Sequence, residues 1–347
     1  MRVLLTGSAG FIGSYVVAEL VARGYQVVGL DDFSKYGRAA APRALDRRYR
    51  LVEGDARDPK LVYDLLEGCD HFVAGAAKVG GIGYYHTFAY DLLAANSRLV
   101  AAACDAAIRR YREGSLQKVT FLSSSMVYES ARSWPAVEGQ QLEMPPPRSA
   151  YGFGQLAVEY FARAARDQYG LPYTIVRPFN CVGVGEPTAP LAVEDGGSPA
   201  TSSRGLGHVV PDLVHKVLRG DDPLHVLGTG EQERCFIYGG DLARGIVTAM
   251  EHPEALNEDF NLSTSEPITI RELATKIWRK IHGPDVPLRV VHDRPLVHDV
   301  MRQVASTEKA KRVLGFEAAT PLDDVLDEII AWAERAAPAA ARATAAG

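Results

Sequence analysis

Three serines and a tyrosine carry the clearest chemical pattern in this sequence. Ser123, Ser124 and Ser125 directly follow the apolar run KVTFL, and Tyr151 opens the segment YGFGQ, which ends at Gln155. Tyr151 and Gln155 are four residues apart, so on a helix both side chains lie on one face. A strand-end serine beside a helical tyrosine predicts hydride chemistry at a carbinol. The tyrosine takes the hydroxyl proton and the serine orients the oxygen.

Three glycines near the N-terminus are spaced to bind the phosphates of a dinucleotide. Gly7, Gly10 and Gly13 follow the apolar strand RVLLT and open a helix that starts with Phe11 and Ile12. The first glycine permits a tight turn, the second lets the backbone approach a pyrophosphate, and the third lets the helix pack closely on the sheet. The N-terminus of that helix offers unpaired N–H groups and the positive end of its dipole to the phosphates.

Acidic residues at the ends of the next two strands predict which dinucleotide binds. Asp31 and Asp32 follow the strand QVVGL, where a carboxylate accepts hydrogen bonds from the adenosine ribose and repels a 2′-phosphate. The sequence therefore favours NAD over NADP, although Asp31 could instead cap the turn that follows it. Asp55, followed by Ala56, ends the third strand, where it either reaches the adenine or belongs to a turn.

Short apolar runs alternate with helical stretches through the first half of the chain, which predicts an α/β fold with a Rossmann-type, doubly wound parallel sheet. We expect an NAD-binding domain over 1–180 and a smaller C-terminal α/β substrate subdomain over 181–335, with Gly240–Glu251 returning to the first domain. The segment Glu186–Gly207 is long for a structureless connection and is expected to cover the substrate. The low-complexity tail 336–347 is expected to be flexible.

Composition argues against several classes of protein. The net charge is −5 and the basic residues are scattered, so nothing indicates nucleic-acid or membrane-surface binding. No apolar run approaches the length of a membrane span, and no secretory signal is recognisable. The cysteines are far apart, which suits a reduced, cytoplasmic protein and argues against a zinc site or a disulfide framework. They are Cys69, Cys104, Cys181 and Cys235.

Taken together, TGSAGFIGS, FLSSSMVYE, YGFGQ and RPFNCVG resemble the extended short-chain dehydrogenase/reductase family, and more narrowly its sugar-nucleotide epimerases and dehydratases. The similarity continues through GHVVPDLV, GEQERCFIYGGDLARGI and RPLVHDVMRQVASTEKAKRVLGF, so it covers nearly the whole chain. The resemblance implies that Ser124 is the catalytic serine and Tyr151 the base. It also implies that Asn180 and Arg234 hold the nucleotide diphosphate and that Asn96 supports the active site.

The resemblance implies a two-part site. NAD is expected to contact Ala76, Ala77, Lys78, Asn96, Tyr151 and Gln155 in addition to the residues of the first three strands. A nucleotide sugar, with UDP favoured and GDP the alternative, is expected to contact Gly81, Tyr84, His86, Ser125, Met126, Asn180, Val209, Arg234 and Arg302. A homodimer is expected through Phe88–Tyr111 and the helix after Tyr151, although the alanines of these helices equally suit contacts within the chain.

Gln155 stands where the family that the chain resembles has lysine. The lysine holds the nicotinamide ribose and lowers the tyrosine pKa by its charge, whereas an amide can hydrogen-bond the ribose but supplies no cation. A nearby opposite charge lowers a pKa by roughly one to three units, so the Tyr151 phenolate should be scarce at neutral pH. Either the nicotinamide charge compensates, or catalysis is slow, or another group is the base. A non-catalytic relative is the alternative.

Ser125 and Met126 stand where 4,6-dehydratases of the family have an Asp-Glu pair, which disfavours that reaction in its usual form. Glu129 is the first candidate for an additional acid or base if its carboxylate points inward, and is otherwise a solvated loop residue. Cys181 and His86 are the next candidates, although a histidine in the position of His86 is more often a surface or packing residue.

The segment KVGGIGYYH forms a pliable loop that is expected to face the nicotinamide and the sugar. With SSSMVYE it is similar to the tunicamycin-pathway enzyme that forms a 5,6-unsaturated UDP-N-acetylglucosamine. Its glycines also resemble a loop of GDP-mannose 3,5-epimerases.

We therefore expect an enzyme that modifies a nucleotide-activated sugar through transient oxidation at C4 by tightly held NAD. A 4-epimerase needs only Ser124 and Tyr151, whereas a dehydratase also needs a base at C5 and an acid at O6. The alternatives are a family member that binds NAD and a nucleotide sugar without efficient redox chemistry, and a simple NAD-dependent sugar dehydrogenase.

Overall fold

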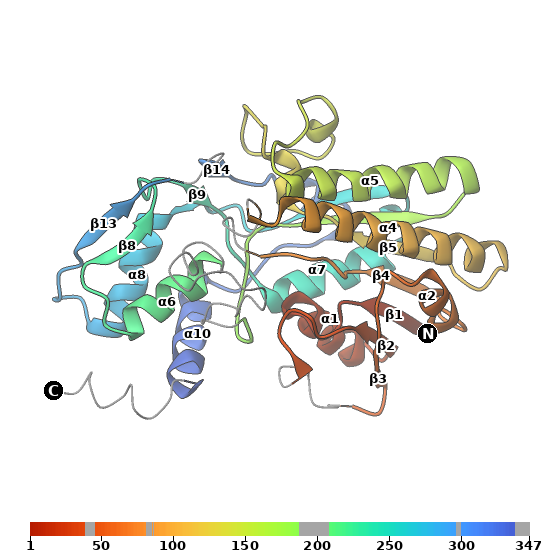
Figure 1. Ribbon diagram of the computed structural model, residues 1–347, viewed down its shortest axis with the longest axis horizontal. Helices are drawn as coiled ribbons and strands as arrows, with labels where there is room; N and C mark the ends of the chain where they lie inside the picture. The colour runs from red at the N-terminus through yellow and green to blue at the C-terminus, as the bar shows by residue number, and fades with distance from the viewer. Residues whose placement is uncertain (39–45, 81–84, 86, 187–207, 296–299, 337–347) are drawn as a thin grey trace.

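The computed structural model describes residues 1–38, 46–80, 85, 87–186, 208–295 and 300–336. Its centre is a seven-stranded parallel sheet in the order β11-β6-β5-β4-β1-β2-β3 (Figure 1). The strands are β1 (Arg2–Thr6), β2 (Gln26–Asp31), β3 (Tyr49–Glu53), β4 (His71–Ala74), β5 (Lys118–Leu122), β6 (Tyr173–Pro178) and β11 (Glu258–Leu262). The predicted Rossmann-type, doubly wound sheet is confirmed.

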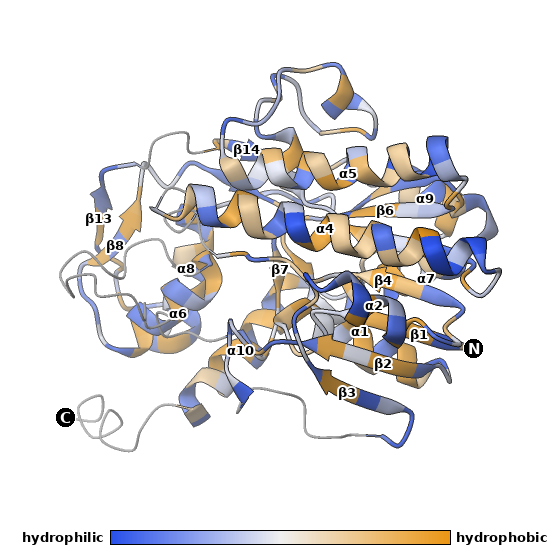
Figure 2. Cartoon of the chain, turned by 45° about the vertical axis from the view of Figure 1, so that its right-hand side comes forward, coloured by the Kyte–Doolittle hydropathy of each residue, from blue (hydrophilic) through white to orange (hydrophobic). Residues whose placement is uncertain are grey.

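Helices cover both faces of this sheet, as strands that are apolar on both sides require. One face carries α2 (Pro59–Leu65), α4 (Ala89–Arg112) and α5 (Ala150–Tyr169). The other carries α1 (Phe11–Ala22), α7 (Gly239–Glu251) and α9 (Glu308–Leu314). In Figure 2, α4 and α5 lie side by side over the sheet. The end of α5 is set by Gly170, whose φ of +74° is unfavourable for other residues.

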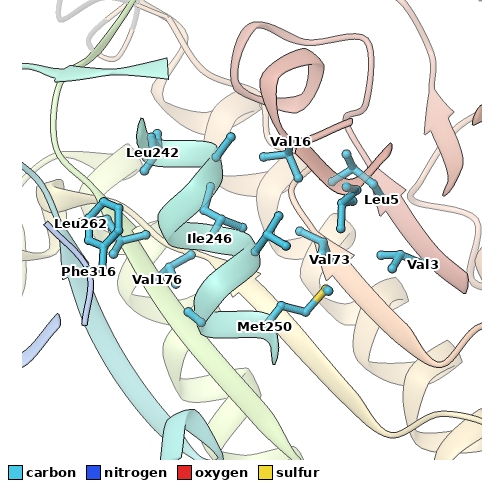
Figure 3. Packing of buried hydrophobic residues seen from close by; sticks show 14 of the residues in the cluster. Val3, Leu5, Val16, Val73, Val176, Leu242, Ile246, Met250, Leu262 and Phe316 are labelled. Carbon is cyan, nitrogen blue, oxygen red and sulfur yellow. The ribbon is translucent and has the colours of Figure 1, made fainter. Parts of the chain in front are cut away.

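Helix α7 fills the core on the second face. Leu242, Ile246 and Met250 are spaced four residues apart and are almost fully buried. Figure 3 shows them packed toward Val16 of α1 and Val73 of β4. The chain therefore returns to the N-terminal unit through α7, and β11 and α9 lie with it. Three elements, α7, β11 and α9, therefore pack with the N-terminal unit, whereas the sequence indicated only the helix over Gly240–Glu251.

The remaining elements form a smaller unit beside the carboxyl ends of the central strands (Figure 1). Its helices are α6 (Val209–Leu218), α8 (Ile270–His282) and α10 (Leu322–Ala336). Its strands are β8 (Leu224–Leu227), β9 (Glu233–Arg234), β12 (Ile268–Thr269), β13 (Val290–Asp293) and β14 (Arg302–Gln303), and the short pair β7 (Cys181–Val182) and β10 (Ile237–Tyr238) joins the units. Within the part of the chain that the structure describes, no helix is both long and apolar enough to cross a membrane.

Lys118, at the start of β5, should make stability depend on pH in an unusual direction. Its Nζ is buried and donates to the Ala249 carbonyl oxygen at 3.0 Å, and burial lowers its pKa from 10.5 to about 8. Between these values the unfolded chain holds a proton that the folded chain has lost, so the free energy of unfolding rises with pH, by on the order of 2 kcal/mol.

We expect Lys118→Met to remove this rise, as measured by denaturant unfolding of both proteins from pH 8 to pH 10.5. Tyrosine and cysteine titrations in the same range are common to both proteins and cancel in the difference. A difference between the two unfolding free energies that stays constant with pH would contradict the prediction.

Candidate active site

A large cavity lies along the carboxyl ends of the central strands, the edge at which parallel sheets bind ligands. Its volume is about 1070 Å³. Its walls come from the turn after β1, the ends of β2, β4 and β5, the start of α5, and α6, β8 and β9 of the smaller unit. The cavity therefore joins the two parts of the chain.

The glycine turn forms one end of this cavity. Gly7 has a φ of +75°, and a side chain at Gly13 would overlap the Gly7 carbonyl oxygen. Gly10 precedes α1 without a side-chain hydrogen bond to the helix, so the first N–H groups stay available for a ligand. Phe11 and Ile12 line the cavity beside them. A turn that a Cβ would fill, next to a free helix N-terminus, fits a diphosphate-containing cofactor.

Asp31, at the end of β2, fixes this turn while lining the cavity. Its Oδ2 accepts a hydrogen bond from the Ala9 N–H at 2.9 Å, and its Oδ1 accepts one from the Phe33 N–H at 2.9 Å. Each carboxylate oxygen keeps a further lone pair, so a turn cap and a ribose acceptor are compatible roles. Asp32 also lines the cavity, and its Oδ1 accepts hydrogen bonds from the Ser34 N–H and the Ser34 hydroxyl.

The next wall follows β3 and β4. Asp55 lines the cavity with Ala56, and Arg57 binds both of its carboxylate oxygens, which keeps the pKa of Asp55 below its ordinary value. Ala76, Ala77 and Lys78 also line it. Asn96 is buried in α4, where it accepts from the Lys78 N–H at 2.7 Å and donates to the Lys78 carbonyl oxygen at 3.1 Å. Asn96 therefore braces this wall from behind and does not line the cavity.

Ser124 and Tyr151 meet inside the cavity, and their side chains share a hydrogen bond. The Ser124 Oγ also accepts from the Met126 N–H at 3.2 Å, because Ser124 caps a short 3-10 helix over Ser125–Tyr128. Burial raises the pKa of Tyr151. The ring of Tyr85 lies parallel to that of Tyr151, with centroids 4.4 Å apart. The phenol is therefore oriented, sheltered and held in its protonated form.

Gln155 lies one helical turn after Tyr151 and lines the same cavity with only 2% of its surface exposed. Its Oε1 is buried and has no hydrogen-bond partner among the described residues. An unpaired buried amide oxygen costs free energy, so a donor in the cavity is expected to meet it. A ribose hydroxyl of a dinucleotide has the required chemistry.

A buried charge network beneath the serines was not predicted from the sequence. The Ser123 Oγ donates to Glu159 at 2.8 Å, and Glu159 is held by Arg177 through contacts of 2.6 and 2.8 Å. Arg177 is fully buried and also pairs with Asp259. Because buried charges need partners, this network fixes α5 against β5, β6 and β11. One signal in the sequence could have pointed to Glu159. Tyr151, Gln155 and Glu159 follow one another at intervals of four residues, so they share one face of the helix.

The Glu129 carboxylate binds Ser149 and not the cavity. Its carboxylate accepts hydrogen bonds from the Ser149 N–H at 3.1 Å and from the Ser149 hydroxyl at 2.6 Å, and it does not line the cavity. Ser149 caps α5 and also accepts from Gly152. The inward orientation required for acid–base chemistry is therefore absent, and Glu129 instead supports the start of the helix that carries Tyr151.

The smaller unit supplies the far wall. Gln303 of β14 donates to the Ser125 Oγ at 2.8 Å and contacts the Met126 sulfur at 3.4 Å. Asn180, with a φ of +28°, donates to the Cys235 carbonyl oxygen at 3.0 Å. All of these except Cys235 line the cavity.

Val209 and Arg234 also belong to the cavity wall, and Arg234 Nη1 donates to the Glu233 carbonyl oxygen at 2.8 Å. Arg302 pairs with the Glu233 carboxylate and lies outside the cavity lining. The expected sugar contacts Gly81, Tyr84 and His86 lie outside the described residues.

Glu186 and His208 line the cavity and were not singled out from the sequence. Glu186 follows the motif RPFNCVG and His208 begins HVVPDLV, so each lies in or beside a recognised segment. Their contact was hidden because 21 residues separate them in the chain.

Comparison with known proteins agrees with this geometry. Residues 3–263 match the model of the NAD dependent epimerase/dehydratase family. The chain belongs to this family. NAD is the cofactor of the family, as Asp31 and the glycine turn predicted.

Individual relatives are similar along almost their whole length. The UDP-glucose 4-epimerase of Corynebacterium glutamicum is 29% identical, over 96% of this chain and 95% of that protein. The structure of UDP-glucose 4-epimerase from Thermotoga maritima with UDP-glucose has a TM-score of 0.80 at 25% identity, covering 97% of this chain and 99% of the other. That of DesIV, a dTDP-glucose 4,6-dehydratase from Streptomyces venezuelae with NAD bound, has a TM-score of 0.80 at 26% identity, covering 96% and 97%. These relatives are named for different reactions, so family membership alone does not select one.

Proposed function

We propose that this family member epimerises or dehydrates a nucleotide-activated sugar through transient oxidation at C4. The observation that carries the proposal is the buried Ser124–Tyr151 pair in a cavity that extends from the glycine turn to Arg234. A UDP-sugar is favoured because two of the relatives are named for UDP-glucose. A GDP-sugar is the alternative.

In this mechanism the protein orients the sugar hydroxyl group and moves its proton. Bound NAD supplies the hydride acceptor. Tyr151 takes the proton of the sugar hydroxyl while Ser124 holds its oxygen, and the hydrogen bond between them sets this geometry. The Gln155 amide would hold a ribose hydroxyl of the cofactor, whose O–H could satisfy the buried, unpaired Oε1. The Glu159–Arg177 pair keeps α5 in register with the strand end.

Incubation of the purified protein with a panel of nucleotide sugars tests the proposal. The panel contains UDP-glucose, UDP-N-acetylglucosamine, UDP-glucuronic acid, dTDP-glucose and GDP-mannose, each with NAD⁺. Loss of one water by mass spectrometry identifies dehydration, and unchanged mass with altered chromatography identifies epimerisation. Steady accumulation of NADH would instead identify a simple dehydrogenase. Absence of any turnover would overturn the proposal and favour a binding protein.

Replacing Asp31 with asparagine should weaken the preference for NAD over NADP. The variant keeps one of the two side-chain oxygens that accept from the Ala9 and Phe33 N–H groups, and it loses the charge that binds ribose hydroxyls and repels a 2′-phosphate. We expect about a tenfold loss of NAD⁺ affinity, the scale of one charge-assisted hydrogen bond, with a smaller loss for NADP⁺. Calorimetric titration of both dinucleotides checks this, with Asp64→Asn, at an exposed position of α2 outside the cavity lining, as the matched control. Equal losses for both cofactors would contradict it.

A homodimer through α4 and α5 is also proposed. The exposed faces of these helices carry large apolar side chains, and Tyr90, Phe153, Tyr160 and Phe161 are each more than one-third exposed. We expect Tyr160→Glu to convert the dimer to a monomer in sedimentation analysis because it places a charge in the contact. A wild-type protein that sediments as a monomer would refute the dimer.

A further inference from the structure

A carboxylate and an imidazole meet in the cavity on a different wall from the serine and tyrosine. Glu186 follows β7, and only 6% of its surface is exposed. Its Oε1 contacts the Nδ1 of His208, the residue that precedes α6. Both residues line the cavity, and neither has a part in the transient oxidation at C4.

Tyr85 connects this pair with the catalytic tyrosine. Its ring is stacked on Tyr151, with centroids 4.4 Å apart and planes 7° from parallel. Burial raises the pKa of Tyr85, and the nearby Tyr151 and Glu186 raise it further. Tyr85, Glu186 and His208 line the same cavity as Tyr151, and the Glu186 charge acts on Tyr85, so the pair and the tyrosine face one chamber.

Other groups around Glu186 are poor proton acceptors. Burial and the Glu186 charge raise the pKa values of Cys181 and Tyr36, so both stay protonated near neutral pH. Lys35 also faces Glu186, which partly offsets the lowering of its pKa by burial. His208 differs from the thiol and the phenols because an imidazole ring carries one nitrogen that donates and one that accepts a proton. With Nδ1 held by Glu186, its Nε2 is the ring nitrogen left to exchange protons.

We propose that His208, positioned by Glu186, is a second acid–base centre that removes a proton from, and returns one to, the sugar carbon beside the transient ketone. The proposal rests on the proposed function and deepens it. A 4-epimerase that only removes and returns hydride has no need of such a group. The pair therefore points to a reaction with carbon–hydrogen exchange, either dehydration or inversion at a carbon adjacent to C4.

After oxidation at C4 to the ketone, the adjacent C–H bond breaks and its proton passes to the His208 Nε2. The electron pair of that bond forms the C=C bond of an enolate, whose negative charge lies on the C4 oxygen next to Ser124 and Tyr151. The Glu186 carboxylate balances the imidazolium charge. Return of the proton inverts the carbon once the ring has turned its opposite face toward His208. In dehydration the enolate electrons form a C=C bond to the neighbouring carbon as its hydroxyl group leaves, and the imidazolium protonates that group to release water.

Turnover in D₂O tests this assignment with the same panel of nucleotide sugars. Mass spectrometry and NMR measure deuterium at sugar carbons, and use of C4-deuterated sugar with absorbance at the nicotinamide band measures hydride transfer separately. We expect the wild-type protein to exchange the hydrogen of a carbon next to C4, seen as solvent deuterium there after inversion or as loss of that hydrogen after dehydration. His208→Gln should lower this exchange at least about 100-fold, on the scale of general acid–base catalysis, while hydride transfer persists. Glu186→Gln should lower it less, and Glu186→Asp should restore part of it.

His215→Gln is the matched control, because His215 lies on the same helix and outside the cavity lining. NAD⁺ titration of every variant establishes that the cofactor site is folded. Conversion of sugar with neither deuterium at carbon nor loss of water would overturn this inference and leave the proposed function intact. Exchange that survives His208→Gln would overturn it as well, and so would loss of hydride transfer together with exchange. No conversion and no hydride transfer with any sugar would overturn both proposals.

Discussion

Replacing Tyr151 with phenylalanine should lower turnover of the nucleotide sugar by roughly 10²–10⁴-fold, the usual contribution of a positioned acid–base group. The change removes one oxygen from a ring that is 7% exposed and stacked on Tyr85, so the packing should survive. It also removes the hydrogen bond with Ser124, which leaves the sugar oxygen with one partner in place of two. Single-turnover conversion of the sugar identified from the panel is the measurement.

Three further variants serve as controls. Tyr169→Phe removes a hydroxyl from the last turn of the same helix, outside the cavity lining, and should leave turnover within about twofold. Ser124→Thr keeps a hydroxyl at the strand end and should retain more activity than Ser124→Ala. NAD⁺ affinity should change little in Tyr151→Phe. Retention of more than a tenth of the wild-type turnover by Tyr151→Phe would rule out Tyr151 as the principal base.

Much of this site could be predicted because its residues sit at positions that local rules define. The glycine turn lies between a strand and a helix, and Asp31 ends the next strand. Ser124 follows β5, and Tyr151 lies in the first turn of a capped helix. Parallel strands all end at one edge of a sheet, so residues after different strands converge without any knowledge of long-range contacts. The Rossmann-type sheet follows from the same regularity.

The residues that escaped prediction depend on contacts between distant segments. Arg177 lies in a strand that reads as apolar, and only the packed structure shows that Glu159 and Asp259 neutralise its charge. Glu129 follows β5 closely, yet its carboxylate accepts hydrogen bonds from both the Ser149 hydroxyl and the Ser149 N–H. Such outcomes are set by which partner a charge finds on burial. Sequence spacing does not encode that choice.

Replacing Gln155 with lysine should raise turnover at neutral pH by roughly 10- to 1000-fold. Burial raises the pKa of Tyr151, and the Ser124 hydrogen bond is the one contact that opposes this among the described residues. A cation one helical turn away should lower the tyrosine pKa by about one to three units. Below that pKa the phenolate population falls tenfold per pH unit, so the pH–rate profile should move to lower pH by the same one to three units.

Gln155→Met separates this charge effect from the hydrogen bond of the amide. Methionine has a similar length but no strong acceptor, so NAD⁺ affinity should fall while the pH–rate profile keeps its position. If Gln155→Lys lowers turnover instead, the amide has a role that a cation cannot replace, and the proton acceptor in this chain is a group other than the Tyr151 phenolate. If the wild-type protein is inactive and the lysine variant turns over sugar, the chain is a family member whose redox centre is impaired at this one residue. The buried, unpartnered Oε1 of Gln155 favours the active case, because it fits a donor from the bound cofactor.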